Sequence, residues 1–271
     1  MTLLHSILLG ILQGATEFIP VSSSGHLVLV PWALGWPNPD LAYDAVVHLG
    51  TLVAVVLAFW GDIVTLVAAW LRSVRERRIA TAEARLAWLI VVSAVPGALL
   101  GCLLGDLFES LFHSPLAVSL LLLVTGLVLF GSAYLARGSH TLSEVRLRDA
   151  ILIGVMQALA IAPGISRSGM TIAAGLYSGL SRDAAARYSF LIGLPLIAGA
   201  SVLTVLDAAS AGWGTGEVAG LLVGFLAAAL SGYLAIRFLL RVLSAHGLRP
   251  FAYYCWAAGG VGLAALALVR A

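Results

Sequence analysis

Lysine is absent from this 271-residue chain, and charged residues of either sign make up only 10% of it. Hydrophobic residues account for 61%, a balance that the water-exposed surface of an ordinary globular protein does not tolerate. This composition favours a lipid bilayer as the surrounding solvent. The net charge is only +2, so we expect no nucleic-acid partner.

Cysteine is also rare, with Cys102 and Cys255 as its two occurrences. They lie far apart in apolar segments, with neither the spacing of a disulfide framework nor that of a metal site. We therefore expect both residues to be buried, inert thiols.

Six apolar stretches approach the length of about 20 residues that a helix needs to cross the hydrocarbon core. They are residues 42–60, 86–105, 115–136, 188–206, 217–240 and 250–270. The sequence thus predicts an all-α polytopic membrane protein with six transmembrane helices.

Arginine is unevenly distributed along the chain. It gathers in residues 72–85 and 137–148, which we interpret as loops after the first and third spans. Such loops face the cytoplasm in most membrane proteins. Arg167 is the exception, because it sits between apolar segments at membrane depth and needs a specific partner there.

Two remaining segments, residues 1–36 and 149–180, each consist of two short apolar stretches broken by Pro, Ser and Gly. At one fixed offset Gln13 matches Gln157, and the Ser-x-Ser-Gly runs at residues 22–25 and 166–169 also coincide. In the assigned topology the two segments enter from opposite sides. The pattern predicts an inverted-topology repeat, residues 1–136 and 149–271, whose re-entrant hairpins meet at their tips around a shared cavity.

The two predicted tips carry the chemistry of an anion site. Each precedes a half-helix, whose free amides and positive dipole end favour an anion. Arg167 adds a planar fork of donors suited to phosphate, and the glycines allow a close approach. The residues predicted to bind phosphate are Ser22, Ser24, Gly25, Ser166, Ser168, Gly169 and Thr171.

Glu17, Ser23 and His26 go beyond binding, because they supply a base, a nucleophile and a proton carrier. Gln13 and Glu17 are four residues apart, so on a helix their oxygens face the same way and can share a divalent cation such as Mg²⁺ or Ca²⁺. Each group also has a plainer interpretation, since a serine-rich loop is commonly turn chemistry and a membrane Glu or His commonly packs helices.

Asp44 and His48 are a further pair four residues apart, near the outer end of the first span. Their side chains either face the cavity or merely cap the helix and reach the interface. The sequence leaves both interpretations open.

Taken together, these motifs resemble the bacterial undecaprenyl-pyrophosphate phosphatases, also called bacitracin-resistance proteins. The likeness covers essentially the whole chain. It rests on Gln13, Glu17 and the run from Pro20 to His26, and on the Pro-Gly-x-Ser-Arg-Ser-Gly run from Pro163 to Gly169.

The resemblance implies an enzyme of the bacterial cytoplasmic membrane that opens to the outer side and removes the terminal phosphate of undecaprenyl diphosphate. That activity recycles a cell-wall carrier lipid and confers bacitracin resistance. It further implies that Ser23 is the nucleophile, that Glu17 and His26 activate it and move protons, that Arg167 clamps the phosphate, and that a divalent cation is required. Gln13 is the less acidic of the family's two options, which weakens a two-carboxylate metal site.

Two alternatives and the oligomeric state stay open at this point. His26 could act as the direct nucleophile in place of Ser23. Inverted repeats with broken helices are also the usual architecture of transporters, so the chain could move a lipid phosphate or another anion. A homodimer is compatible with the sequence.

Overall fold

The structure is a computed structural model that describes residues 2–135, 138–211 and 215–270; Arg137 lies outside these ranges. Six helices are long and apolar enough to cross a membrane, which confirms the prediction of an all-α polytopic protein. Within the described ranges no strand forms beyond one isolated bridge between His140 and Leu180. The six are α3 (Leu41–Ala58), α5 (Ala82–Phe112), α6 (Pro115–Leu135), α9 (Arg182–Ala211), α10 (Thr215–His246) and α11 (Arg249–Arg270).

Four shorter helices form two hairpins at the two predicted breaks. They are α1 (Leu3–Phe18) and α2 (Ser23–Leu34), then α7 (Leu147–Leu159) and α8 (Arg167–Tyr177). The longest, with 16 residues, spans about 24 Å at 1.5 Å per residue, less than the roughly 30 Å of hydrocarbon. Neither helix of either hairpin is thus long enough to cross the hydrocarbon core alone. That the hairpins enter a bilayer and return on the same side stays a prediction.

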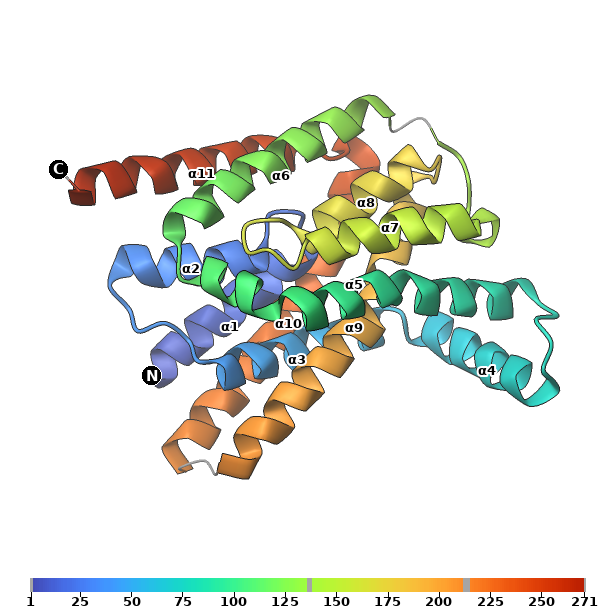
Figure 1. Cartoon of the computed structure of the whole chain (residues 1–271), viewed down its shortest axis with the longest axis horizontal. Helices are drawn as coiled ribbons and strands as arrows, with labels where there is room; N and C mark the ends of the chain where they lie inside the picture. The colour runs from blue at the N-terminus through green and yellow to red at the C-terminus, as the bar shows by residue number, and fades with distance from the viewer. Residues whose placement is uncertain (1, 136–137, 212–214, 271) are drawn as a thin grey trace.

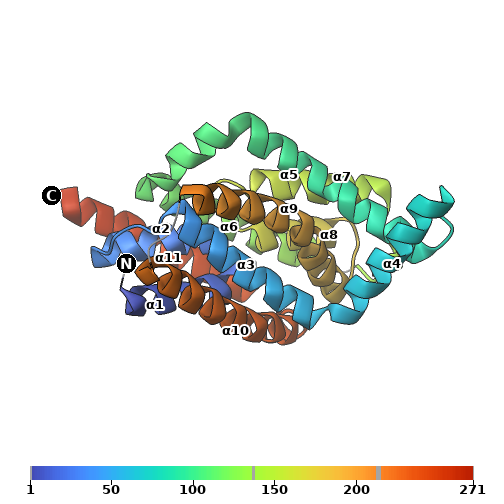
Figure 2. The ribbon, with the colours of Figure 1, turned by 90° about the horizontal axis from the view of Figure 1, so that it is seen from below.

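Equivalent helices of the two halves pack in equivalent ways. α1 packs on α10 and α7 packs on α5, while α3 crosses α9 and α6 lies beside α11 (Figures 1 and 2). A glycine makes the first two contacts close: a Cβ on Gly10 would lie 2.4 Å from the Gly224 carbonyl oxygen, and one on Gly154 would lie 2.6 Å from that of Ser93. This pairing is what a pseudo-two-fold repeat requires, although the inverted orientation in a membrane stays a prediction.

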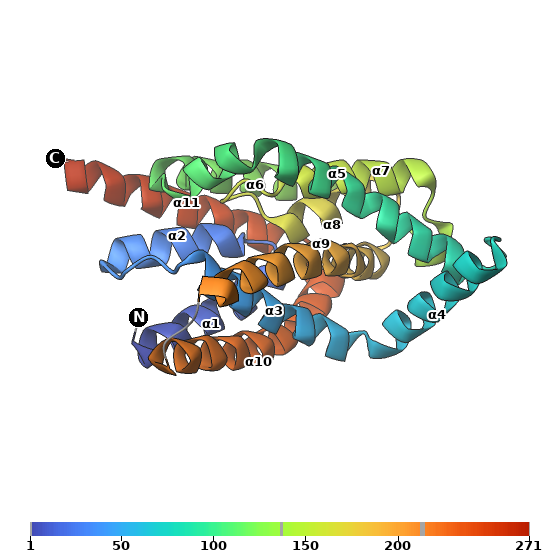
Figure 3. The ribbon, with the colours of Figure 1, turned by 60° about the horizontal axis from the view of Figure 1, so that its bottom comes forward.

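The segment after α3, predicted as a loop, is instead the helix α4 (Trp60–Glu76). It projects from the body of the protein and leans on α5 (Figures 1 and 3). The Trp88 indole of α5 donates to Ser73 Oγ of α4 over 3.0 Å. A helix with apolar side chains on one face and arginines on the other lacks a continuous apolar run, so a search for spans does not find it.

The expectation of two buried thiols holds for Cys255 and is wrong for Cys102. Cys255 is fully buried, whereas Cys102 is exposed on α5. In a membrane protein an apolar neighbourhood in sequence does not imply burial, because the outer faces of the helices meet lipid rather than water.

Candidate active site

The turn between α1 and α2 and the turn between α7 and α8 lie in direct contact, as the sequence predicted. Ser22 Oγ accepts a hydrogen bond from the Gly164 amide over 3.1 Å. Ser168 Oγ donates to the Ile19 carbonyl oxygen over 3.4 Å. Thr125 of α6, which the sequence analysis did not single out, donates to the Gly164 carbonyl oxygen over 2.9 Å and holds the second turn in place.

The helices that follow the two turns begin in the same way. Ser22 caps α2 by accepting from the Gly25 amide over 3.2 Å, and Ser166 caps α8 by accepting from the Gly169 amide over 3.1 Å. Ser22 does so at a φ of +68°, a conformation that residues other than glycine rarely adopt outside functional sites. The first amides of α2 and α8 have no acceptor within their own helices, and each cap satisfies one of them. The positive ends of two helices therefore converge at this point.

Glu17 is the centre of the polar cluster between the turns. Its Oε2 accepts from Ser23 Oγ over 2.6 Å and from Gln13 Nε2 over 3.0 Å. Its Oε1 accepts from Arg167 Nη2 over 3.0 Å. With a residue exposure of 6%, this carboxylate depends on these donors to offset the loss of hydration.

Arg167 reaches Glu17 across the boundary between the two hairpins. Its Nη1 also donates to the Ser189 carbonyl oxygen of α9 over 3.4 Å. Gly193 makes room for the guanidinium, since a Cβ there would lie 2.1 Å from Nη1. Arg167, the arginine that lies outside the predicted loops, therefore has space for its guanidinium at Gly193 and a charged partner in Glu17.

His48 extends the cluster and resolves the position of the pair that the sequence left open. Its Nδ1 lies 2.8 Å from the Asp44 carbonyl oxygen, an atom that only accepts, so Nδ1 carries the proton. Its Nε2 then points toward Glu17 Oε2 at 3.7 Å. The imidazole nearest to Glu17 thus comes from α3, and spacing alone could not have told whether this face turned inward.

A cavity of about 170 Å³ opens beside this cluster. It adjoins an apolar groove of about 740 Å³ between α3, α5 and α9, with Asp44, His48 and Ile161 among the residues that line both. The polar residues that line the cavity are Glu17, Ser22, Ser23, Ser24, Asp44, His48, Gln157, Ser166 and Arg167.

His26 lies apart from this cavity. Its Nδ1 is 2.7 Å from the Ser22 carbonyl oxygen, and its Nε2 is 2.7 Å from the hydroxyl oxygen of Tyr254 on α11. The His26 and Tyr254 rings also stack at 15° with their centroids 5.6 Å apart. Because the carbonyl oxygen only accepts, Nδ1 donates to it and Nε2 accepts from the Tyr254 hydroxyl.

Four residues predicted to bind phosphate do not line this cavity and are occupied by bonds within the protein. The amides of Gly25 and Gly169 serve the two caps. Thr171 Oγ1 donates to the Arg167 carbonyl oxygen over 2.8 Å and lies 2.6 Å from Ser189 Oγ, while Ser168 Oγ bonds across to the first turn. Their direct contact with a ligand stays a prediction, and in this arrangement they support the turns.

The donors around Glu17 fit a divalent cation only in part. In the described ranges there is no cluster of three His, Cys, Asp or Glu residues able to hold a metal. However, the Oε1 atoms of Gln13 and Gln157 are buried and lack a hydrogen-bond partner. A hard cation at Glu17 and Gln13 would therefore take most of its oxygen ligands from a bound phosphate and water.

Six long apolar helices around a buried set of carboxylate, hydroxyl, imidazole and guanidinium groups define a class, the polytopic membrane enzymes. Comparison with known proteins gives the particular family. The model of the family described as "Bacitracin resistance protein BacA" matches residues 6–261. The chain therefore belongs to the BacA family and is an enzyme of the phosphatase class.

Curated relatives cover almost the full length of the chain. A protein of Pelobacter propionicus is 42% identical over 261 residues, or 96% of each chain. One of Geobacter sulfurreducens is 43% identical over 267 residues, covering 98% of this chain and 99% of its own. One of Thermomicrobium roseum is 40% identical over 278 residues and covers both chains completely. All three carry the name "Undecaprenyl-diphosphatase".

Proposed function

We propose that the chain hydrolyses undecaprenyl diphosphate to undecaprenyl phosphate and inorganic phosphate at the cavity beside Glu17. One observation carries this proposal: Ser23 and Arg167, from two turns far apart in sequence, converge on the same buried carboxylate. A nucleophile, a base and a phosphate clamp thereby share one site.

The apolar groove supports a lipid substrate. A diphosphate headgroup in the polar cavity leaves its prenyl chain beside α3, α5 and α9, where glycines at 97, 101 and 199 line the groove. The groove holds far more apolar than polar surface, which suits a hydrocarbon chain. A soluble phosphate ester would make no use of it.

In the proposed reaction the Ser23 hydroxyl gives its proton to Glu17 and its oxygen forms a bond to the terminal phosphorus. The bond from that phosphorus to the bridging oxygen breaks, and undecaprenyl phosphate leaves. Glu17 passes this proton to the departing undecaprenyl phosphate. It then deprotonates a water molecule, whose oxygen forms a bond to the phosphorus as the bond from phosphorus to Ser23 Oγ breaks, and Glu17 returns that proton to Ser23. Arg167 neutralises the phosphoryl oxygens during both steps, which requires it to exchange its bond to Glu17 for bonds to the substrate.

A divalent cation is part of this proposal, with Glu17 and Gln13 as the protein ligands. When bound, it would neutralise charge on the phosphates. The steps assigned to Ser23, Glu17 and Arg167 do not depend on it.

The structure of the His26 environment favours Ser23 as nucleophile over the alternative. Ser23 Oγ touches a carboxylate at the cavity wall, whereas the Nε2 of His26 is held by Tyr254 on another helix. We propose that His26 holds the first turn through its bond to the Ser22 carbonyl oxygen.

The test is phosphate release from undecaprenyl diphosphate by protein purified in detergent, where no second compartment exists and transport gives no signal. Ser23→Ala should abolish release, and Ser132→Ala should not, since Ser132 is also buried but bonds only to its own helix. Acid quenching during turnover should trap phosphate on Ser23. Phosphate trapped on His26 would instead establish the alternative nucleophile, and silence of the wild-type protein with Mg²⁺ supplied would favour a transporter.

The cellular setting follows from the same proposal. We place the protein in the bacterial cytoplasmic membrane with the cavity open to the outer side, because the loop arginines at the far ends of the helices would then face the cytoplasm. Expression in a sensitive bacterium should raise the bacitracin concentration that stops growth, and Ser23→Ala should remove that effect.

A further inference from the structure

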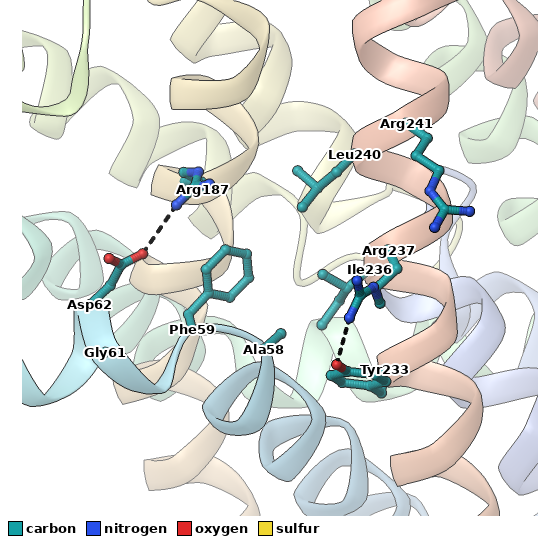
Figure 4. A pocket seen from close by; sticks show the side chains of 10 residues that line it. All are labelled: Ala58, Phe59, Gly61, Asp62, Arg187, Tyr233, Ile236, Arg237, Leu240 and Arg241. Atoms are coloured by element: carbon teal, nitrogen blue, oxygen red, sulfur yellow. Dashed lines mark hydrogen bonds and ion pairs between the residues drawn. The ribbon is translucent and has the colours of Figure 1, made fainter.

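A second cavity lies where α3 ends at Ala58, and Figure 4 shows the side chains that line it. We call it the arginine pocket; its volume is about 500 Å³. Asp44 on α3 lines the cavity beside Glu17, and Ala58 on the same helix lines the arginine pocket. Fourteen residues of helix separate these two positions, which corresponds to about 21 Å. The residues lining the arginine pocket are Ala58, Phe59, Gly61, Asp62, Arg187, Tyr233, Ile236, Arg237, Leu240 and Arg241.

The charges in this pocket do not balance. Arg187 is neutralised, because its Nη1 pairs with Asp62 at 3.3 Å and its Nε pairs with Asp183 at 2.8 Å. Arg237 and Arg241 have no carboxylate within salt-bridge distance in the described part of the chain. Two unpaired guanidinium groups thus line a single pocket.

The helical spacing places these two arginines together. They are four residues apart on α10, where like charges repel and destabilise the helix slightly. Arg237 is also oriented, since its Nη1 donates to the Tyr233 hydroxyl over 2.9 Å and its guanidinium lies 5.7 Å from the centre of that ring. Figure 4 shows Arg241 one turn further along the same helix. An anion between them would remove the repulsion.

The remaining wall of the pocket is apolar. Phe59, Ile236 and Leu240 contribute rings and alkyl chains beside the guanidinium groups. The pocket is built at the ends of α3, α9 and α10, all of which are long enough to cross a membrane. Its ligand should therefore carry both a compact anionic group and hydrocarbon, as a membrane lipid does at the level of its headgroup.

We propose that the arginine pocket binds the phosphate headgroup of an anionic membrane lipid through Arg237 and Arg241, with a phosphomonoester preferred because its two charges match two unpaired cations. Arginine suits this role, because its planar fork donates two parallel hydrogen bonds to phosphate oxygens. A headgroup bound here lies too far from Ser23 to react. The site is therefore a binding site separate from the proposed catalytic cavity.

The experiment measures binding of dioleoyl phosphatidic acid to the detergent-purified full chain by native mass spectrometry. The test variant is Arg237→Gln with Arg241→Gln. The matched control is Arg75→Gln with Arg77→Gln, which removes the same charge from exposed positions at the end of α4. Arg241→Gln alone provides a milder variant, because that side chain has no hydrogen-bond or ion-pair partner to lose among the described residues.

The dissociation constant for phosphatidic acid should rise at least tenfold in the test variant, rise less in Arg241→Gln, and stay within twofold of wild type in the control. An unchanged constant in the test variant would overturn the proposal. Inorganic phosphate is titrated in a parallel arm; if it displaces the lipid at equal concentration, the site recognises free phosphate and the lipid assignment is wrong.

Phosphate release from undecaprenyl diphosphate is measured on the same samples. It should stay within twofold of wild type in every variant, because the arginine pocket takes no part in the proposed reaction. Turnover lost in parallel with lipid binding would contradict the separation of the two sites. If the proposed phosphatase activity is wrong, the wild-type protein itself releases no phosphate. The measurement of phosphatidic acid binding is unaffected in that case.

Discussion

Glu17→Gln should separate catalysis from phosphate binding, because the two depend on Glu17 in opposite ways. The substitution preserves the shape of the side chain but removes its charge. Ser23 then loses the carboxylate that accepts its proton at 2.6 Å. Arg167 loses the anion that holds it at 3.0 Å and becomes available to a phosphate.

The magnitudes of the two effects follow from the geometry. Loss of a positioned general base lowers turnover by about 10²- to 10⁴-fold. A phosphate at Arg167 would approach Glu17 to about 4 Å, where two like unit charges repel by about 4 kcal/mol at an effective dielectric constant of about 20. Arg167 and its neighbours share part of that cost, so we expect phosphate to bind at least about tenfold more tightly, which is about 1.4 kcal/mol.

Turnover is measured by phosphate release, and phosphate affinity by the rise in melting temperature during a phosphate titration in EDTA. Glu109→Gln is the control, because it makes the same chemical change at an exposed position of α5. Weaker phosphate binding by Glu17→Gln in EDTA would refute the repulsion argument. If Glu17→Gln binds phosphate more weakly than wild type only when Mg²⁺ is added, Glu17 holds the phosphate through a cation. Turnover of Glu17→Gln within threefold of wild type would exclude Glu17 as the general base.

Two further predictions concern the supports of the site. Tyr254→Phe keeps the ring that stacks on His26 but removes the hydroxyl bonded to Nε2. We expect kcat to fall about fivefold to twentyfold, because one hydrogen bond of about 1–2 kcal/mol is lost. An unchanged kcat would exclude a positioning role for this hydroxyl. Gly193→Ala places a Cβ against Arg167 Nη1, so KM for the lipid diphosphate should rise about tenfold. Gly260→Ala is the control and should leave KM unchanged, because its Cβ would lie in open space. Equal KM values in the two variants would show that Arg167 does not need the space at Gly193.

Much of the fold was predictable because hydrophobic length is a direct consequence of membrane thickness. The contact between the two turns was also predictable, because broken backbone at membrane depth needs protein partners. The bonds from the Gly164 amide to Ser22 Oγ and from Ser168 Oγ to the Ile19 carbonyl oxygen show how those partners are supplied.

Other features depended on information that the sequence does not carry locally. The orientation of His48 toward Glu17 depends on how α3 is rotated against its neighbours, and spacing along one helix does not determine that rotation. Thr125 and Ser189 were missed because a single hydroxyl in an apolar helix resembles ordinary helix packing. Cys102 was misplaced because apolar residues face lipid as readily as they face the core.

The two capped helices α2 and α8 each begin with a residue that carries chemistry, and these residues occupy the same position in the two repeats: Ser23 in one and Arg167 in the other. An identical pair of residues would have placed two hydroxyls at the site without the guanidinium charge, or two guanidinium groups without the hydroxyl. Under the proposed function, divergence at this pair gives the two matching positions different roles, a nucleophile in the first repeat and a phosphate clamp in the second. If these proposed roles are correct, neither half of the chain supplies both groups, and exchanging the two residues should move the positive charge from the second turn to the first.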